Sequence, residues 1–118
     1  AVLHYFTRFC PGASDDGVGV TVTNERILYQ TVPVEALRSY LLEYEYRCPA
    51  GGLMRLQVNW LDGSGAFLST SLEVRACSGE PARESLVGQA PARAAQGLVY
   101  VNAHDATEVR VTRVSLRE

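Results

Sequence analysis

The feature that most constrains the fold of this sequence is a two-residue alternation of apolar and polar side chains. It is clearest over 39–47 (SYLLEYEYR) and 53–61 (LMRLQVNWL), where every second residue is aliphatic or aromatic. Successive side chains of a strand point to opposite faces, so this period predicts strands with one buried face. We therefore predict an all-β chain with strands at 2–9, 17–23, 26–34, 39–47, 53–61, 66–76, 84–88, 95–102 and 107–116.

Turn residues separate these segments. The clearest hairpin is at 62–65 (DGSG), and 10–17, 48–52 and 77–85 have the composition of loops. In the last segment Val109 and Val111 are out of phase with Val114 and Leu116, which predicts a β-bulge near 112–113. Short strands at this spacing predict a two-sheet antiparallel β-sandwich of jelly-roll type.

Size and composition are those of one ordinary globular domain covering residues 1–118. The net charge of -2 gives no reason to expect a nucleic acid partner, and no apolar run reaches the ~20 residues of a membrane span. All 11 basic residues are arginine, a bias that favours a GC-rich bacterial source. Because the chain begins at Ala1, we expect a mature form or an excised part of a longer protein.

The only tryptophan, Trp60, lies just before the predicted hairpin, where a sugar-binding protein can hold a stacking residue. Parity puts Trp60 on the same face as Met54, Leu56 and Val58. On the following strand, parity groups Leu68, Thr70, Leu72 and Val74 on the apolar side and Phe67, Ser69, Ser71 and Glu73 on the other. We therefore predict that Trp60 belongs to the core.

Four segments resemble the β-sandwich carbohydrate-binding modules that accompany bacterial glycan enzymes. They are ILYQTVPVEALRSYLLEYEYR (27–47), LQVNWLDGSGAFL (56–68), APARAAQGLVYV (90–101) and ATEVRVTRVSL (106–116). The resemblance implies a non-catalytic accessory module with a glycan or polysaccharide as partner, tethered to a catalytic domain. It also implies a secreted protein, extracellular or periplasmic.

In the arrangement of that family, the strands near 27–34, 95–102, 53–61 and 66–76 lie side by side and form a concave sheet. The resemblance then implies a polar outer face that includes Thr31, Gln96, Leu98, Ser69 and Ser71. Tyrosine rings stack on sugar C–H surfaces, and polar side chains pair with hydroxyls. The residues expected to bind a ligand are Tyr29, Arg55, Gln57, Asn59, Glu73 and Tyr100.

One departure from the family favours an alternative function. Many such modules carry a second tryptophan before the segment that begins with Ala-Pro, here 90–101. At the corresponding place this chain reads ESLVGQAP (84–91), without an aromatic residue. The alternative is a structural or protein-interaction domain with no small ligand, which packs on a neighbouring domain or subunit.

Three cysteines, Cys10, Cys48 and Cys77, each end a predicted strand, and the antiparallel order brings all three ends to one pole of the sandwich. We favour a Cys48–Cys77 disulfide, because the end of strand 66–76 should lie beside the start of strand 53–61. A Cys10–Cys48 bridge and three free thiols remain as alternatives.

Metal binding and catalysis find little support. A zinc site of the three cysteines with His104 would lack the short C-x2-C spacing of structural zinc sites. No cofactor is expected, although modules of the resembled family often hold a structural calcium, for which Asp15, Asp16, Asp105 and Glu108 are candidate ligands. The two histidines, His4 and His104, lie on separate segments, and a carboxylate pair such as Glu43 with Glu73 is the remaining alternative. We predict that the chain is not an enzyme.

Overall fold

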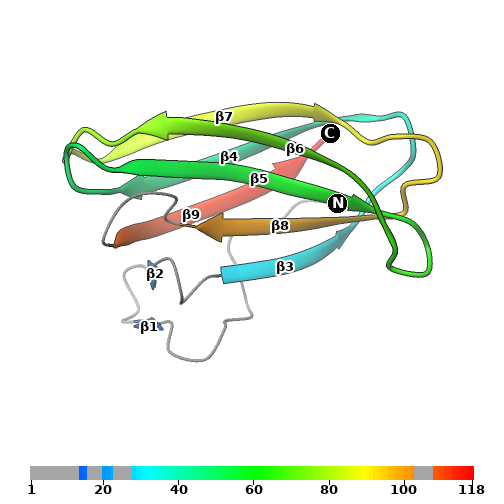
Figure 1. Ribbon diagram of the computed structural model, residues 1–118, viewed down its shortest axis with the longest axis horizontal. Coiled ribbons are helices and arrows are strands. Elements are labelled where there is room, and N and C mark those ends of the chain that lie inside the picture. Colours follow the sequence, from blue (N-terminus) through cyan, green and yellow to red (C-terminus); the bar gives the residue numbers. More distant parts are fainter. Residues whose placement is uncertain (1–13, 16–19, 23–27, 103–107) are drawn as a thin grey trace.

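A computed structural model describes residues 14–15, 20–22, 28–102 and 108–118, which form two antiparallel sheets (Figure 1). These residues contain strands and turns but no helix, and so no helix that could span a bilayer. The strands are β1 (Ser14–Asp15), β2 (Val20–Val22), β3 (Leu28–Pro33), β4 (Ser39–Arg47), β5 (Leu53–Leu61), β6 (Phe67–Ala76), β7 (Ala82–Gln89), β8 (Gln96–Asn102) and β9 (Val109–Arg117).

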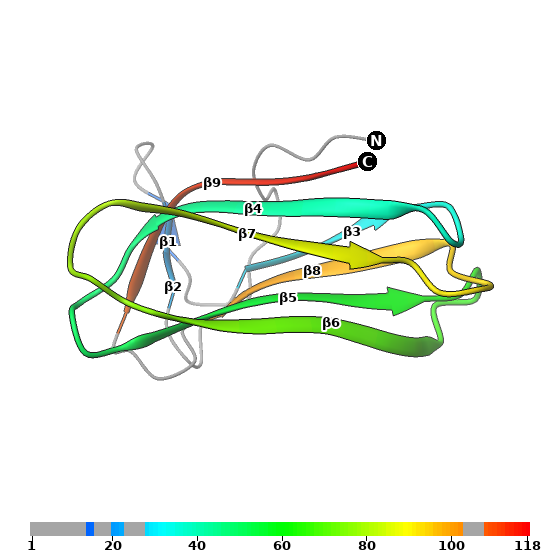
Figure 2. The same ribbon diagram turned by 90° about the horizontal axis from the view of Figure 1, so that it is seen from above.

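The two sheets pack face to face, with β4 and β7 in one layer and β5 and β6 in the other (Figure 2). The five-stranded sheet has the order β1-β2-β9-β4-β7, and the four-stranded sheet has the order β3-β8-β5-β6. The predicted all-β sandwich is therefore confirmed. The second order is also the one implied for the four strands of the concave sheet.

The alternating segments fold over the ranges that their period predicts. Strands β4 and β5 have the predicted bounds, and their burial alternates residue by residue. Strand β7 is longer than the predicted 84–88, because its pairing with β4 runs from Ser39↔Gln89 to Tyr46↔Ala82. Two residues of the predicted loop 10–17 pair with β2 as β1, and the predicted strand 2–9 lies outside the described residues.

Trp60 is a core residue, as its parity predicted, and only 1% of its surface is exposed. Its ring lies 5.8 Å from that of Tyr40, and Nε1 donates a hydrogen bond to Ser71 Oγ at 3.0 Å. A Cβ built on Gly88 would lie 3.2 Å from the indole and one on Gly97 would lie 3.4 Å from it. The absence of side chains at these two glycines makes room for the largest side chain of the core.

The predicted hairpin joins β5 to β6. Asp62 Oδ1 accepts hydrogen bonds from the backbone N–H groups of Ser64 (2.9 Å) and Ala66 (3.0 Å), and Gly65 has a φ of +88°. Just beyond it the register steps from Leu61↔Phe67 to Trp60↔Ser69, so Leu68 is an extra residue on β6. This bulge decides which side chains of β6 face the core.

The predicted bulge in the last strand is also present. Pairing between β4 and β9 steps from Glu45↔Arg113 to Tyr46↔Val111, and Thr112 is the extra residue. The Thr112 hydroxyl donates to the Glu45 carbonyl at 3.1 Å. The step puts both halves of β9 in phase with the core, where Val111 and Val114 are buried.

At the end of the sandwich opposite the hairpin, a disulfide joins Cys48, after β4, to Cys77, after β6. Their Cα atoms lie 5.4 Å apart. The Cys77 N–H donates to the Gly52 carbonyl at 3.0 Å, and the Gly79 N–H donates to the Cys48 carbonyl at 2.9 Å. The bridge therefore ties the edge strand β6 to a central strand of the other sheet, and it is the pair that the sequence favoured.

Candidate functional site

The outer face of the four-stranded sheet presents ordered rows of side chains, because residues directly opposite in an antiparallel pair lie on the same face. One row runs Tyr29–Tyr100–Gln57–Leu72, and the next runs Thr31–Leu98–Asn59–Thr70. Next to the first row lies the pair Arg55–Val74, and next to the second row lies a third row of four, Pro33–Gln96–Leu61–Phe67. At ~4.8 Å between strands, a row of four is about 14 Å wide.

A pair of tyrosines forms one half of this face. Tyr29 on β3 is directly opposite Tyr100 on β8, and both side chains are half-buried. A half-buried tyrosine packs part of its ring and leaves part exposed, which suits stacking on a sugar ring. The structure thus brings the two predicted stacking residues together on neighbouring strands.

Beside the tyrosines lies a chain of polar contacts. Gln57 Nε2 donates to Asn59 Oδ1 at 2.9 Å, and Thr70 Oγ1 donates to the same oxygen at 2.7 Å. Among the described residues, no further hydrogen bond involves Asn59 Nδ2 or Gln57 Oε1. The contacts orient both amides and leave a donor and an acceptor for a ligand.

The Tyr100 backbone is held from behind by the other sheet. Tyr44 on β4 is completely buried, and its hydroxyl donates a hydrogen bond to the Tyr100 carbonyl. Burial raises the pKa of the Tyr44 hydroxyl well above its usual range, so this group stays protonated and remains a donor. A side chain that crosses the core therefore fixes the strand at the centre of the outer face.

Arg55 is the one charged side chain among the described outward residues of the four strands. It is half-buried and directly opposite Val74 on β6. It lies one row from Gln57, so the predicted residues Arg55, Gln57 and Asn59 form a continuous line along β5.

The predicted position of Glu73 is wrong. Glu73 is directly opposite Leu56, a core residue, and so lies on the inner side of β6 together with Ser69 and Ser71. The bulge at Leu68 shifts the parity, and the outward residues of β6 are Thr70, Leu72 and Val74 instead.

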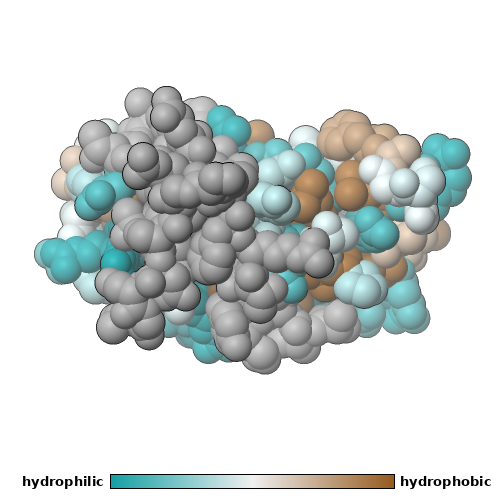
Figure 3. All heavy atoms as spheres, turned by 90° about the horizontal axis from the view of Figure 1, so that it is seen from below, coloured by the Kyte–Doolittle hydropathy of each residue, from teal (hydrophilic) through white to brown (hydrophobic). Residues whose placement is uncertain are grey.

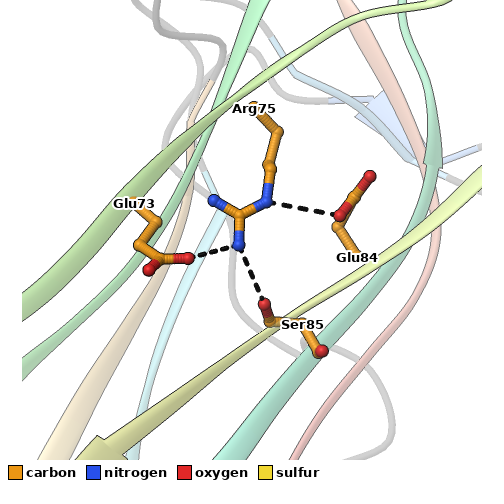
Figure 4. A network of polar contacts seen from close by, with 4 residues as sticks. All are labelled: Glu73, Arg75, Glu84 and Ser85. Carbon is orange, nitrogen blue, oxygen red and sulfur yellow. Dashed lines mark hydrogen bonds and ion pairs between the residues drawn. The ribbon is translucent and has the colours of Figure 1, made fainter.

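Glu73 belongs to a polar network that closes the edge of the sandwich between β6 and β7 (Figure 4). Arg75 Nη2 contacts the Glu73 carboxylate and donates to the Ser85 carbonyl at 3.3 Å, while Arg75 Nε is 3.3 Å from Glu84 Oε2. Glu73 first, and then Glu84, raise the pKa of the Arg75 guanidinium. The Glu73 carboxylate therefore has an intramolecular partner at the edge and does not face the outer surface.

Two aliphatic side chains of the outer face were not foreseen. Leu72 is 45% exposed and Val74 is 40% exposed, although their alternation with polar residues assigns them to the core. Their outward position follows from the bulge at Leu68. The sequence gives no sign of this bulge, because Leu68 is half-buried against the core like an ordinary apolar residue.

No acid–base pair forms from the predicted carboxylates. Glu43 contacts Arg83 at 3.6 Å on the five-stranded sheet, whereas Glu73 contacts Arg75 on the other sheet. Both histidines lie outside the described residues.

Of the predicted calcium ligands, Asp16 and Asp105 lie outside the described residues, and Glu108 is exposed. Within the part of the chain that the structure describes, no group of three or more His, Cys, Asp or Glu side chains is arranged to hold a metal.

A depression of about 620 Å³ lies on the five-stranded sheet, lined in part by Arg47, Arg83 and Tyr46. Its cations already have partners: Arg83 contacts Glu45 at 3.5 Å, and Arg47 Nε donates to the Gly79 carbonyl at 2.9 Å. The paired tyrosines and amides on the four-stranded sheet are better suited to a neutral ligand rich in hydroxyl groups.

Viewed from below, the side on which β3 lies in Figure 1, the described surface mixes apolar and polar side chains (Figure 3). This view looks onto the edge of the sandwich, whereas the outer face of the four-stranded sheet is turned toward the viewer of Figure 1.

Comparison with solved structures identifies the fold. The chain superimposes on the CBM22-1–GH10 structure of Clostridium thermocellum xylanase 10B with a TM-score of 0.64 and 14% identity, over 98% of this chain and 25% of that one. It superimposes on the CBM22-1 xylan-binding domain of Paenibacillus barcinonensis Xyn10C with a TM-score of 0.62 and 9% identity, over 99% of this chain and 92% of that one. This is a carbohydrate-binding-module-like fold.

The carbohydrate-binding-module-like fold also occurs within larger proteins. The active domain of tailspike protein 4 from bacteriophage CBA120 matches with a TM-score of 0.64 and 12% identity, over 98% of this chain. The chain spans about a fifth of that protein (19%) and a quarter of the xylanase structure (25%). No protein-family model and no curated protein matches the sequence.

Proposed function

We propose that this chain is a non-catalytic accessory module that binds a glycan across the outer face of the sheet β3-β8-β5-β6. The observation that carries the proposal is one row of side chains across three strands. Tyr29 is directly opposite Tyr100, and Tyr100 is directly opposite Gln57, with Asn59 in the next row. The fold supports it, since the matched structures include carbohydrate-binding modules.

In the proposed mode of binding, Tyr29 and Tyr100 stack on sugar rings, while Gln57, Asn59 and Arg55 pair with hydroxyls. Such binding is reversible. If the module is tethered to a catalytic domain outside the cell, it raises the effective concentration of polysaccharide at that domain. Glu73 has no place in this arrangement, because it lies on the inner side of β6.

A broad glycan array tests the proposal, with wild-type chain compared with Tyr100→Ala. We expect the wild-type chain to bind specific glycans and the variant to bind them with at least tenfold lower affinity, because a stacked aromatic contributes most of the apolar contact. The matched control is Val87→Ala on the outer face of the other sheet, which should bind as wild type. Binding that survives Tyr100→Ala would move the site to the loops, and no binding to any glycan would reject the proposal.

A second candidate is a structural or protein-interaction domain that packs on a second copy or a neighbouring domain. Three large apolar side chains, Leu37, Phe67 and Val87, are each more than half exposed. Light scattering across a concentration series tests packing on a second copy. A dimer that Val87→Ser dissociates would favour this function, whereas a monomer at all concentrations would count against packing on a second copy.

A further inference from the structure

Strand β6 carries its polar and apolar residues on the opposite sides from a normal strand of a sandwich. Its inner side holds Ser69, Ser71 and Glu73, whereas its outer side holds Leu72 and Val74. A strand that covers a core normally buries its aliphatic residues and exposes its polar ones.

The inner polar residues have a structural explanation. Ser71 accepts the Trp60 indole hydrogen, and Glu73 contacts Arg75 at the edge of the sandwich. The outer aliphatic residues have none, because Leu72 and Val74 remain 45% and 40% exposed. Thr70 on the same side shows that a polar strand-forming residue fits there. Leu72 and Val74 are thus neighbouring aliphatic side chains that a ligand on the outer face can contact.

The neighbours of this aliphatic pair define the ligand chemistry. Leu72 is directly opposite Gln57, and Thr70 is directly opposite Asn59. Residues so placed have Cβ atoms about 5 Å apart. A surface for methyl groups thus lies one strand away from two oriented amides, and among the described residues Asn59 Nδ2 has no hydrogen-bond acceptor.

An acetyl group combines the two features that this arrangement would bind, a methyl and a carbonyl oxygen on the same carbon. A sugar that carries only hydroxyls offers no methyl to Leu72 and Val74. We infer that the outer face selects glycans that carry acetyl groups, with the methyl against Leu72 and the carbonyl oxygen accepting a hydrogen bond from Gln57 or Asn59, while Val74 extends the apolar surface along β6. The inference rests on the proposed function.

The test compares pairs of ligands that share a backbone, of which one member carries acetyl groups. The wild-type chain is titrated with penta-N-acetylchitopentaose and with cellopentaose, which share a β-1,4-linked backbone and differ at C2, where an acetamido group replaces a hydroxyl. Ester acetylation is tested with acetylated xylan before and after mild alkali. The strongest ligand found on the array is titrated in the same way, against its acetyl-free counterpart. We expect the acetylated member of at least one pair to bind about tenfold more tightly, since it adds one buried methyl and one hydrogen bond.

The matched variants are Leu72→Ser on the outer face of β6 and Val87→Ser, an equally apolar edge position on the other sheet. Leu72→Ser should reduce the preference for the acetylated member to about twofold or less, and Val87→Ser should leave it unchanged. A wild-type chain that binds a glycan with no preference for acetylation, or a preference that survives Leu72→Ser, would overturn this inference and leave the proposed function intact. Failure to bind any glycan would reject the proposed function, and the inference with it.

Discussion

Strands β5 and β6 are neighbours in one sheet, joined by a tight hairpin, yet their side chains are distributed in opposite ways. β5 alternates regularly, with Leu56, Val58 and Trp60 in the core and polar residues outside. β6 turns Ser71 and Glu73 inward and leaves Leu72 outside. The difference follows from position: β5 is flanked by β8 and β6, whereas β6 is an edge strand whose inner side faces the rim of the sandwich. A central strand must supply core, but an edge strand can place polar residues inward where partners at the rim satisfy them.

The largest expected effect tests the core side of β5. Trp60→Ala should lower the free energy of unfolding by about 4 kcal/mol, because it leaves a cavity between the sheets. Urea unfolding followed by circular dichroism measures it. Asn59→Ala, the outward neighbour on the same strand, is the matched control and should cost less than about 1 kcal/mol. Similar losses in both variants would show that β5 does not have one buried and one open face.

A smaller effect tests the inner side of β6. Ser71→Ala removes the acceptor of the buried Trp60 N–H, and we expect the free energy of unfolding to fall by about 1–2 kcal/mol. Ser69→Ala, two residues earlier on the same side, is the control and should be close to wild type. If the two variants are equally stable, the inward serines are tolerated at the rim and do not stabilise it.

The smallest effect concerns the hairpin between the two strands. Hydrogen bonds from the Ser64 side chain, and then from the Ala66 and Ser64 backbone, lower the pKa of Asp62. A lowered pKa in the folded state gives stability that is present above the unfolded value of ~3.9 and is lost as pH falls through the folded value. The melting temperature of wild type should therefore exceed that of Asp62→Asn at pH 6, and the gap should close as pH falls from ~4 to ~2. A gap that stays constant over this range would mean that the carboxylate charge contributes nothing.

The sequence was sufficient wherever one physical rule acted alone. Alternation located β4 and β5 with their bounds, and the change of phase in β9 located the bulge at Thr112. It was insufficient at β6, where the extra residue, Leu68, is itself apolar and fits a core pattern. The same bulge explains the one misplaced site residue. The alternation that assigned Glu73 to the outer face took no account of the extra residue, and so it assigned the wrong face to the residues of β6 that follow Leu68. Tyr29, Tyr100, Gln57 and Asn59 lie on strands without that irregularity, and the register brings them into adjoining rows.

The bond from Tyr44 has a consequence for how such a surface can diversify. The Tyr44 hydroxyl donates to the backbone carbonyl of residue 100 on β8, so the bond does not depend on the side chain at that position. This backbone support therefore survives exchange of the outward residue, so the same strand can present a different side chain in place of Tyr100. Loss of the buried phenol would instead remove a backbone support and leave a cavity between the sheets, so we expect natural variation to hold residue 44 more constant than residue 100.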